Sequence, residues 1–268
     1  MNIKHLLVIL LLISTLFADK KITTFVKQDR KFLYVYITNK NIFDITLKVD
    51  AKIDFSNKSV QKSKIMSLKA NSKTKVLEIK RLSNRFKYSS KYNWILGNMN
   101  SVHDDNYLYR LPYKLNTKQM VSQGFNGKFS HFKQSKYAVD FALDNNTKIY
   151  AARAGQIVLV KNDFKKGGNS RKFIKLANQI TIKHSDGTYA SYAHLKYKGS
   201  IVKEGDFVQR GEFIGYSGQT GYSNGPHLHF IVYKAKNHKE RESIKVKFIA
   251  KRGIIKEPLE KKFYIAQP

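Results

Sequence analysis

The stretch GQTGYSNGPHLHF, from Gly218 to Phe230, joins a glycine-rich turn to an apolar run that carries two histidines, His227 and His229. If this run is a β-strand, successive side chains point to opposite faces, so the two imidazoles share one face and Leu228 takes the other. Two imidazoles side by side indicate either a metal site or an acid/base pair. The competing interpretation is a pair of satisfied histidines on a half-buried strand.

The sequence around this stretch predicts an all-β domain over residues 114–250. Glycines are frequent from Val121 onward, and strand-like runs lie between them. These runs are TKIYAA (147–152), GQIVLV (155–160), NQITIKH (178–184), TYASYAHL (188–195) and GEFIGYSG (211–218). Short β-branched and aromatic runs bounded by glycine turns are typical of antiparallel sheets. Residues 251–268 lack a clear period, and we expect them to form a basic C-terminal tail.

Residues 19–113 predict a separate, β-sandwich-like N-terminal domain. The segments FLYVYI (32–37), DITLKVD (44–50) and TKVLEI (74–79) read as short strands separated by polar turns. Pro112 interrupts the strand pattern and marks the boundary. The only polar cluster here, His103 with Asp104 and Asp105, is expected to have a structural or solvated role.

The first 18 residues predict a signal peptide. Lys4 and His5 precede an apolar run from Leu6 to Phe17, which has the length of a signal-peptide core and is short for a membrane span. Cleavage after Ala18 leaves no stable membrane span, whereas an uncleaved anchor is the alternative. Either way, we expect an exported protein of the periplasm or cell envelope.

Composition restricts the chemistry of any site. The 268 residues include no cysteine, so a metal must be held by His, Asp or Glu. The formal net charge of +31 predicts attraction to a polyanion. For an exported protein that polyanion is an anionic cell-envelope polymer, and no nucleic-acid partner is expected.

Two further motifs bear on the site. Asp140 stands between Val139 and Phe141 in an apolar strand, where a carboxylate needs a bound cation or a buried Lys or Arg partner. GYSNG (221–225) matches the G-x-S-x-G elbow of serine hydrolases, but that elbow requires a following helix, and here Pro226 and a strand follow. Ser223 is therefore expected to lie in a turn.

The motifs QGFNGKFSH, YAVDFA, ASYAHL and GQTGYSNGPHLHF, in this order, resemble those of the lysostaphin-type zinc metallopeptidases of bacterial cell walls, family M23. The resemblance runs from about Gln123 to Phe248. It implies a compact antiparallel β domain with a narrow groove and one zinc ion per chain. It also implies that Asp140 and His229 are zinc ligands and that His194 and His227 are catalytic.

The first histidine ligand departs from the commonest pattern of this family. That pattern places a histidine four residues before the aspartate, where this chain has Lys136. The Ser130–His131 dipeptide instead resembles a variant with a longer insertion, which implies His131 as the third ligand.

These features predict a zinc-dependent peptidoglycan hydrolase that cleaves peptide cross-links or stem peptides. It would act either as an endopeptidase, which could be D,D-specific, or as a carboxypeptidase. Zinc would activate the attacking water. The alternative from another class is a non-enzymatic wall-binding regulator or activator of other wall hydrolases. A third interpretation, a biotinyl or lipoyl carrier domain, rests on GDFVQRGEFIGYSG (205–218), which lacks the acceptor lysine at the turn. The sequence makes no prediction of oligomeric state.

Overall fold

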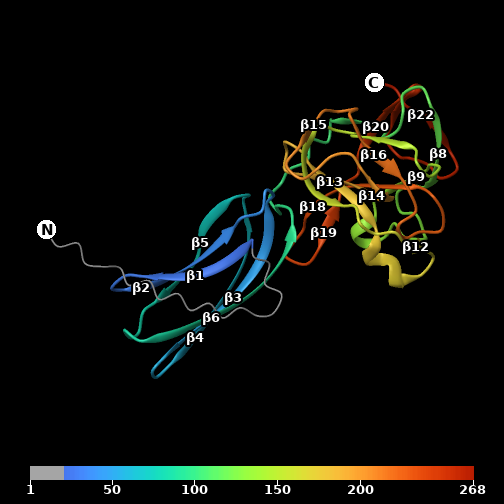
Figure 1. The fold of residues 1–268 in the computed structure, drawn as a ribbon. Helices are drawn as coiled ribbons and strands as arrows, with labels where there is room; N and C mark the ends of the chain where they lie inside the picture. The colour runs from blue at the N-terminus through green and yellow to red at the C-terminus, as the bar shows by residue number, and fades with distance from the viewer. Residues whose placement is uncertain (1–20) are drawn as a thin grey trace. The chain divides into compact units, whose positions relative to one another are not determined.

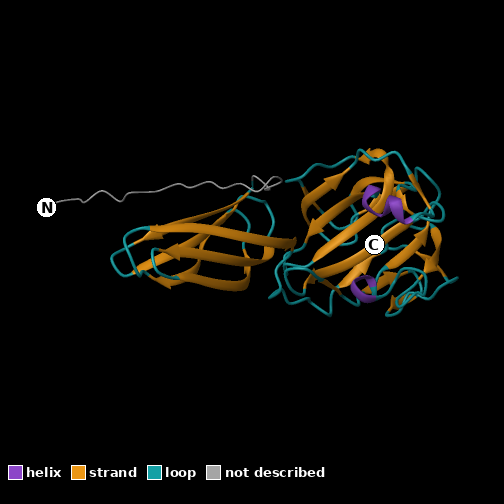
Figure 2. Ribbon diagram, turned by 90° about the horizontal axis from the view of Figure 1, so that it is seen from below, coloured by secondary structure: helices purple, strands orange, loops and turns teal. Residues whose placement is uncertain are grey.

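The computed structural model describes residues 21–268, so the predicted signal peptide at 1–18 lies outside the described residues. This part of the chain divides into two compact units, 21–99 with 235–239, and 100–234 with 240–268. Strands form nearly all of the regular structure in both units, as the sequence predicts (Figure 2). Within 21–268 no helix is long and apolar enough to cross a membrane.

The first unit is a sandwich of two three-stranded antiparallel sheets. One has the order β1–β2–β5 and the other β4–β3–β6 (Figure 1). In the first sheet alternate side chains of β2, namely Leu33, Val35 and Ile37, are buried. A hydrogen bond joins the two sheets, because the Tyr92 hydroxyl in the second sheet donates to the Ile22 carbonyl in the first at 2.9 Å. The strands are β1 (Ile22–Gln28), β2 (Phe32–Asn39), β3 (Ile45–Phe55), β4 (Ser59–Leu68), β5 (Ser72–Lys80) and β6 (Phe86–Leu96).

The second unit is built on one large sheet, whose main path runs β15–β11–β13–β14–β18–β9–β8–β22. Its strands are β8 (Lys118–Gln123), β9 (Val139–Ala142), β10 (Lys148–Tyr150), β11 (Gly155–Lys161), β13 (Asn178–Lys183), β14 (Tyr189–Ser200), β15 (Phe207–Val208), β16 (Phe213–Ser217), β18 (Leu228–Ala235), β19 (Arg241–Ser243) and β22 (Phe263–Ile265). Strand β16 pairs with β10 and β14, and β19 pairs with β18. This arrangement puts β14, β18, β9 and β8, which carry the predicted site residues or flank them, side by side.

Smaller elements border this sheet. Strands β12 (Gly167–Gly168) and β17 (Gly221–Tyr222) form a parallel pair, and β7 (Leu108–Arg110), β20 (Lys247–Ala250) and β21 (Gly253–Ile255) form a second small sheet. The helices of the described chain are two short 3-10 segments, η1 (Lys133–Ser135) and η2 (Arg171–Leu176). A core of aromatic and aliphatic side chains, including Tyr109, Phe141, Phe230 and Phe248, packs in edge-to-face contacts beneath the sheet.

The structure groups two segments differently from the sequence-based division at residues 113 and 250. Residues 100–113 belong to the second unit, because β7 pairs in parallel with β20. Residues 251–268 also belong to it, since β21 pairs with β20, and β22 pairs with β8. We call residues 251–266 the C-terminal strap, because they carry two strands that pair with separate parts of the unit.

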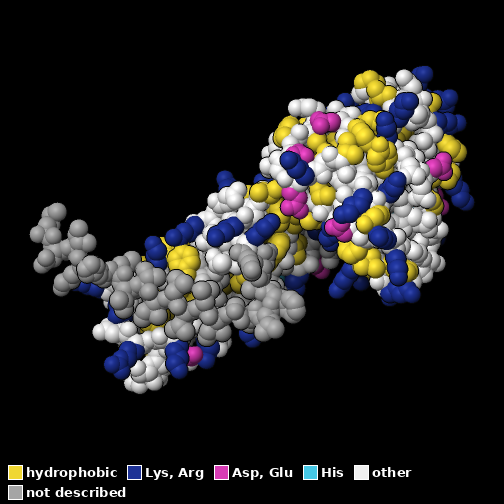
Figure 3. Space-filling model, in the orientation of Figure 1, with side chains coloured by type: hydrophobic (Ala, Val, Ile, Leu, Met, Phe, Trp, Pro, Cys, Tyr) yellow, Lys and Arg dark blue, Asp and Glu magenta, His cyan; other side chains and the backbone are white. Residues whose placement is uncertain are grey.

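On the face drawn in Figure 3, basic side chains are spread out and do not gather in one place. Figure 3 shows Lys and Arg scattered over the visible face of both units, with few acidic side chains between them. The sequence has 50 Lys and Arg against 19 Asp and Glu. A dispersed charge of one sign gives general attraction to polyanions and does not build a defined binding site.

Candidate active site

Strand register places Asp140 at the centre of the site. Strand β9 lies between β8 and β18, so Asp140 is directly opposite His229 on one side and Gln123 on the other. The two sequence motifs YAVDFA and GPHLHF, far apart in the chain, are therefore neighbours in the sheet. His229 Nδ1 lies 2.8 Å from Asp140 Oδ1.

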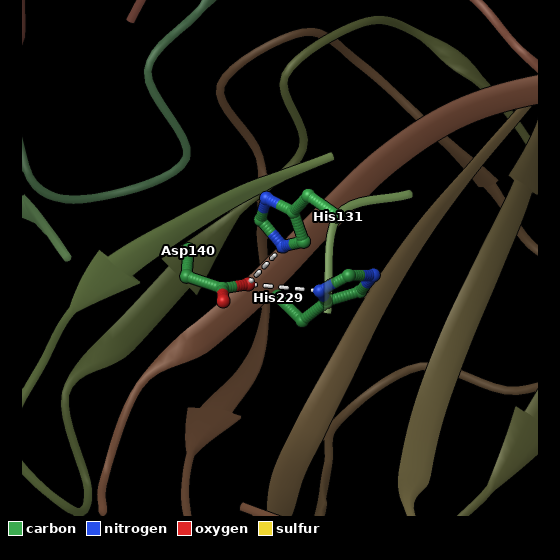
Figure 4. Close-up of side chains that lie close together, drawn as sticks. All are labelled: His131, Asp140 and His229. Atoms are coloured by element: carbon green, nitrogen blue, oxygen red, sulfur yellow. Dashed lines mark hydrogen bonds and ion pairs between the residues drawn. The ribbon is translucent and has the colours of Figure 1, made fainter. Parts of the chain in front are cut away.

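His131 completes a three-residue cluster from the loop between β8 and β9. Its Nε2 atom lies 3.2 Å from Asp140 Oδ1, and both side chains are almost fully buried (Figure 4). One ligand-type atom from each of His131, Asp140 and His229 lies within 4.8 Å of the others. Lys136, which occupies the commoner ligand position of the resembling family, is exposed and lies over the Tyr137 ring.

Backbone carbonyls fix the orientation of three imidazoles around Asp140. The Nδ1 atoms of His131, His194 and His227 lie 2.7, 2.7 and 2.9 Å from the carbonyl oxygens of Gly124, Thr220 and Gly225. A neutral imidazole that donates from Nδ1 has an unprotonated Nε2, which is free to bind a metal or accept a proton. This is an arrangement typical of metal and acid/base sites.

His194 reaches the site through a β-bulge. The register of β13 with β14 passes from Gln179–Ala193 to Asn178–Leu195, so His194 is the extra residue in the ladder. Its φ of 64° lies in the left-handed region, which is unfavourable for a residue with a side chain. The bulge turns the ring toward His227, with ring centroids 4.5 Å apart.

Burial and mutual contact shift the acidity of the cluster. Burial alone would raise the pKa of Asp140, but the neighbouring imidazoles of His131 and His229 outweigh it and hold that pKa well below its usual value. Burial, followed by the proximity of His227 and His229, lowers the pKa of His194 to about 3. Burial also lowers the pKa of His229, although the Asp140 carboxylate opposes this. These shifts favour the ionised form of Asp140 and the neutral forms of His194 and His229.

Gln123 is a site residue that the sequence analysis did not single out. Its Nε2 donates to Asp140 Oδ2 at 3.1 Å and to the Ser130 hydroxyl at 2.7 Å, while its Oε1 accepts from the Phe129 amide at 3.0 Å. It therefore ties the free oxygen of Asp140 to the loop that carries His131. The sequence signal for Gln123 was its position. It lies two residues after Val121, on the strand that leads into the QGFNG turn.

A groove of about 1090 Å³ lies over the cluster. Its lining includes Asp140, His194, His227 and His229 and extends to the loops at 124–130 and 222–226, to Ile174 and Arg241, and to residues 257–260 of the C-terminal strap. The basic segment 161–173 contributes no lining residue, although Ile174 directly after it does.

Three further polar residues of this unit, His184, Asn178 and Ser223, lie outside this chemistry. His184 is buried against Tyr109, with Nδ1 2.9 Å from the Ala154 carbonyl oxygen. Asn178 holds the backbone of Phe164. The Ser223 hydroxyl donates to the Gly225 carbonyl, and strand β18 rather than a helix follows, so the nucleophile-elbow geometry is absent from this segment.

The donor set fits a zinc ion. His131 Nε2 is buried without a hydrogen-bond partner, although a carboxylate oxygen faces it. Two imidazole nitrogens and one carboxylate oxygen are ligands that zinc accepts, and three protein ligands leave one position open. The side-chain partners of Asp140 are His131, His229 and Gln123 within 3.2 Å and His227 at 3.9 Å, none of which carries a permanent positive charge. A bound cation would satisfy both observations.

Comparisons with known proteins agree with this geometry. Residues 134–241 match Peptidase family M23. Lysostaphin of Staphylococcus staphylolyticus is 42% identical over 96 residues, which cover 35% of this chain and 18% of that protein. An uncharacterized metalloprotease of Buchnera aphidicola is 34% identical over 144 residues, 50% of this chain and 35% of that protein. The peptidoglycan DD-endopeptidase ShyA of Vibrio cholerae is 31% identical over 122 residues, 44% of this chain and 26% of that protein.

A solved structure covers the same region. The catalytic domain of the antimicrobial peptidase lysostaphin from Staphylococcus simulans aligns at 29% identity with a TM-score of 0.34, over 48% of this chain and 88% of that domain. The chain spans at most about a third of the length of the three relatives above. The match to Peptidase family M23 falls on residues 134–241, within the unit that holds the His–Asp cluster, and over this region the chain is similar in sequence to lysostaphin.

Proposed function

We propose that the chain is an exported, zinc-dependent peptidase that hydrolyses peptide bonds in the cross-links or stem peptides of peptidoglycan. The observation that carries the proposal is the cluster of His131, Asp140 and His229, of which Asp140 and His229 line a groove together with His194 and His227. The named activity of the DD-endopeptidase relative supports peptidoglycan as the substrate. The net charge of +31 supports association with anionic polymers of the envelope.

In this proposal one zinc ion would be held by His131, Asp140 and His229. When bound, zinc supplies a Lewis acid that polarises the scissile carbonyl and lowers the pKa of a bound water to about 7. The Gly124 carbonyl and the Gln123 amide orient His131 and Asp140 for this task.

His194 and His227 handle the protons. Each donates from Nδ1 to a backbone carbonyl, so each presents an unprotonated Nε2 to the groove. One Nε2 accepts the proton released by the attacking water and later donates it to the leaving amine. The other holds the water in line with the carbonyl. Their rings are 4.5 Å apart, so both reach a single bound peptide.

The test is incubation of residues 19–268 with purified peptidoglycan, followed by mass analysis of the released fragments. The protein is used as prepared, after chelation, and after zinc is restored. New free termini that vanish on chelation and return with zinc support the proposal and identify the bond. Zinc binding without cleavage of any wall type contradicts peptidase activity. Absence of both leaves the alternative of a wall-binding regulator.

A further inference from the structure

Two arginines of the second unit are buried, and only one of them has a carboxylate partner. Arg110 and Arg153 are 4% and 6% exposed, and Arg153 lies 2.6 Å from the Asp186 carboxylate. The Arg110 side chain forms no ion pair within residues 21–268, and its one hydrogen bond there runs from Nη1 to the Leu111 carbonyl oxygen at 3.0 Å. Because a guanidinium carries five N–H donors, most of those of Arg110 have no partner in the described chain.

The surroundings of Arg110 fix its guanidinium and leave space beside it. The guanidinium carbon lies over the Tyr150 ring, 5.0 Å from the ring centroid. Gly211 adjoins it, since a Cβ atom there would lie 3.5 Å from Arg110 Nε and 4.0 Å from Cζ. Glycine is also favoured at this position by its φ of 86°. The space that a side chain would fill at Gly211 is therefore next to the unused donors.

A second arginine belongs to the same turn. Arg210 directly precedes Gly211, is half-buried, and forms no ion pair with the part of the chain that the structure describes. Burial lowers the pKa of Arg110, and the charge of Arg210 lowers it further. Glu212 follows in the turn, but its Oε2 accepts from the Gln209 amide at 2.8 Å and does not pair with either arginine. Two guanidinium groups that repel each other, one of them buried, call for an anion.

We propose that Arg110 and Arg210 form a binding site for a phosphate group, separate from the groove over the His–Asp cluster. Neither arginine lines that groove, and the inference does not depend on the proposed peptidase activity. The planar fork of a guanidinium matches two oxygens of a phosphate in parallel hydrogen bonds. Two positive charges also suit a phosphate better than a carboxylate, which carries a single negative charge. The lysines dispersed over the surface have no comparable fixed geometry.

The experiment follows the arginine Nε–H signals of zinc-loaded residues 19–268 by NMR while inorganic phosphate is added at constant ionic strength. These signals are local, so they separate this site from phosphate that binds the metal ion. We expect the Arg110 and Arg210 signals to shift together and to saturate. Acetate, added in a parallel titration, should bind at least tenfold more weakly, because one negative charge meets two guanidinium groups.

Three variants test the two arginines. Arg210→Ala should weaken phosphate binding by about tenfold, as expected for loss of a hydrogen bond to a charged group. Arg110→Lys keeps the charge but loses the fork, and a similar weakening is expected. The matched control is Arg171→Ala, which removes the same charge at an exposed position on η2 and should bind phosphate like the wild type. The melting temperature of each variant checks its folding. If Arg110→Lys does not fold, the half-buried Arg210 still provides the test.

Arginine signals at 110 and 210 that do not move with phosphate would overturn the inference. Equal weakening by Arg171→Ala and Arg210→Ala would also overturn it, because net charge alone would then explain binding. Acetate that binds as tightly as phosphate contradicts the choice of ligand, and Arg110→Lys with wild-type affinity contradicts the role of the fork. A free phosphate ion and a phosphodiester unit of an envelope polymer present the same group. Tighter binding of glycerophosphoglycerol than of inorganic phosphate assigns the polymer as the source, and weaker binding assigns the free ion.

Discussion

Two aspartates of the second unit, the buried Asp140 and the half-buried Asp186, both have a pKa below the usual value, for different reasons. Burial would raise the pKa of Asp186, but Thr188 and the Arg153 guanidinium, 2.6 Å away, lower it to about 2. Asp140 has imidazoles and an amide around it instead of an arginine. The chain itself thus supplies the cation that neutralises Asp186, namely Arg153, whereas the surroundings of Asp140 suit a cation that binds from solution.

The difference separates a carboxylate with a structural role from the one that we propose as a metal ligand. A buried charge needs a partner of opposite charge. When the chain itself supplies that partner, the carboxylate is no longer available to bind a metal ion. Imidazoles can be neutral, so they shield Asp140 without neutralising it permanently. Substitution of Asp140 should therefore reduce metal binding, whereas substitution of Asp186 should leave metal binding intact and reduce stability.

The largest effect is expected from Asp140→Asn or His229→Ala. Each removes one of three ligand atoms, so zinc affinity should fall by more than about 100-fold, since residues that only orient a ligand already account for 10–100-fold. Activity should disappear with the metal. Metal content by mass spectrometry and hydrolysis of peptidoglycan check this. A metal-free variant that remains active would refute the ligand assignment.

Next in size is His227→Ala. This residue lies 3.9 Å from Asp140 Oδ1 through Nε2 but is not one of the three clustered ligand residues. We expect the zinc content to stay at the wild-type level and the rate of hydrolysis to fall by about 10²–10⁴-fold, as for loss of a general acid/base. Loss of zinc together with activity would instead make His227 a ligand.

Gly124→Ala should weaken the metal site from a distance. A Cβ atom there would lie 2.1 Å from the Pro258 carbonyl oxygen, so the loop and the C-terminal strap must separate. Because the Gly124 carbonyl orients His131, we expect zinc affinity to fall by about 10–100-fold. Titration against a chelator and the absorption spectrum of the cobalt-substituted protein measure the change.

Gly225→Ala is the matched control, since a Cβ atom at Gly225 meets nothing within 4 Å. Its zinc affinity and cobalt spectrum should remain those of the wild type. Unchanged values for Gly124→Ala as well would mean that the strap does not influence the His131 position.

The smallest effect is expected from Asp186→Asn, which should keep zinc and lose stability. The folded-state pKa of Asp186 is depressed, so its contribution is present above the unfolded value near 4 and is lost as the pH falls toward 2. The shift corresponds to about 2 kcal/mol of unfolding free energy at pH 7. Urea unfolding at pH 7 and pH 3 checks this. A constant difference between variant and wild type at both pH values would contradict the ion-pair explanation.

Much of the fold could be read from the sequence because the strands carry strong local patterns. The segments 32–37 and 44–50 alternate clearly and form β2 and β3. The GPHLHF motif and the apolar setting of Asp140 pointed to the residues that the register then places opposite each other. Both signals are local, but they left alternatives open, and the roles of Asp140 and His229 were predicted from the family resemblance.

Other features depend on contacts that no local pattern encodes. Strand β7 has three residues, and its partner β20 is far away in the chain, so the place of residues 100–113 was not visible. The strands of the C-terminal strap are equally short. Gln123 looked like an ordinary polar residue at a strand end, because its role arises only when β9 lies beside it.

The bulge at His194 means that sheet regularity and chemistry conflict at one position. Without this residue the β13–β14 ladder would pair without interruption, and no side chain would adopt a left-handed backbone that costs roughly 1–2 kcal/mol. A search for heat-resistant variants would therefore favour loss of this bulge, and with it the proton-transfer role that we propose for His194. Thermal tolerance is consequently a misleading criterion for improving this protein.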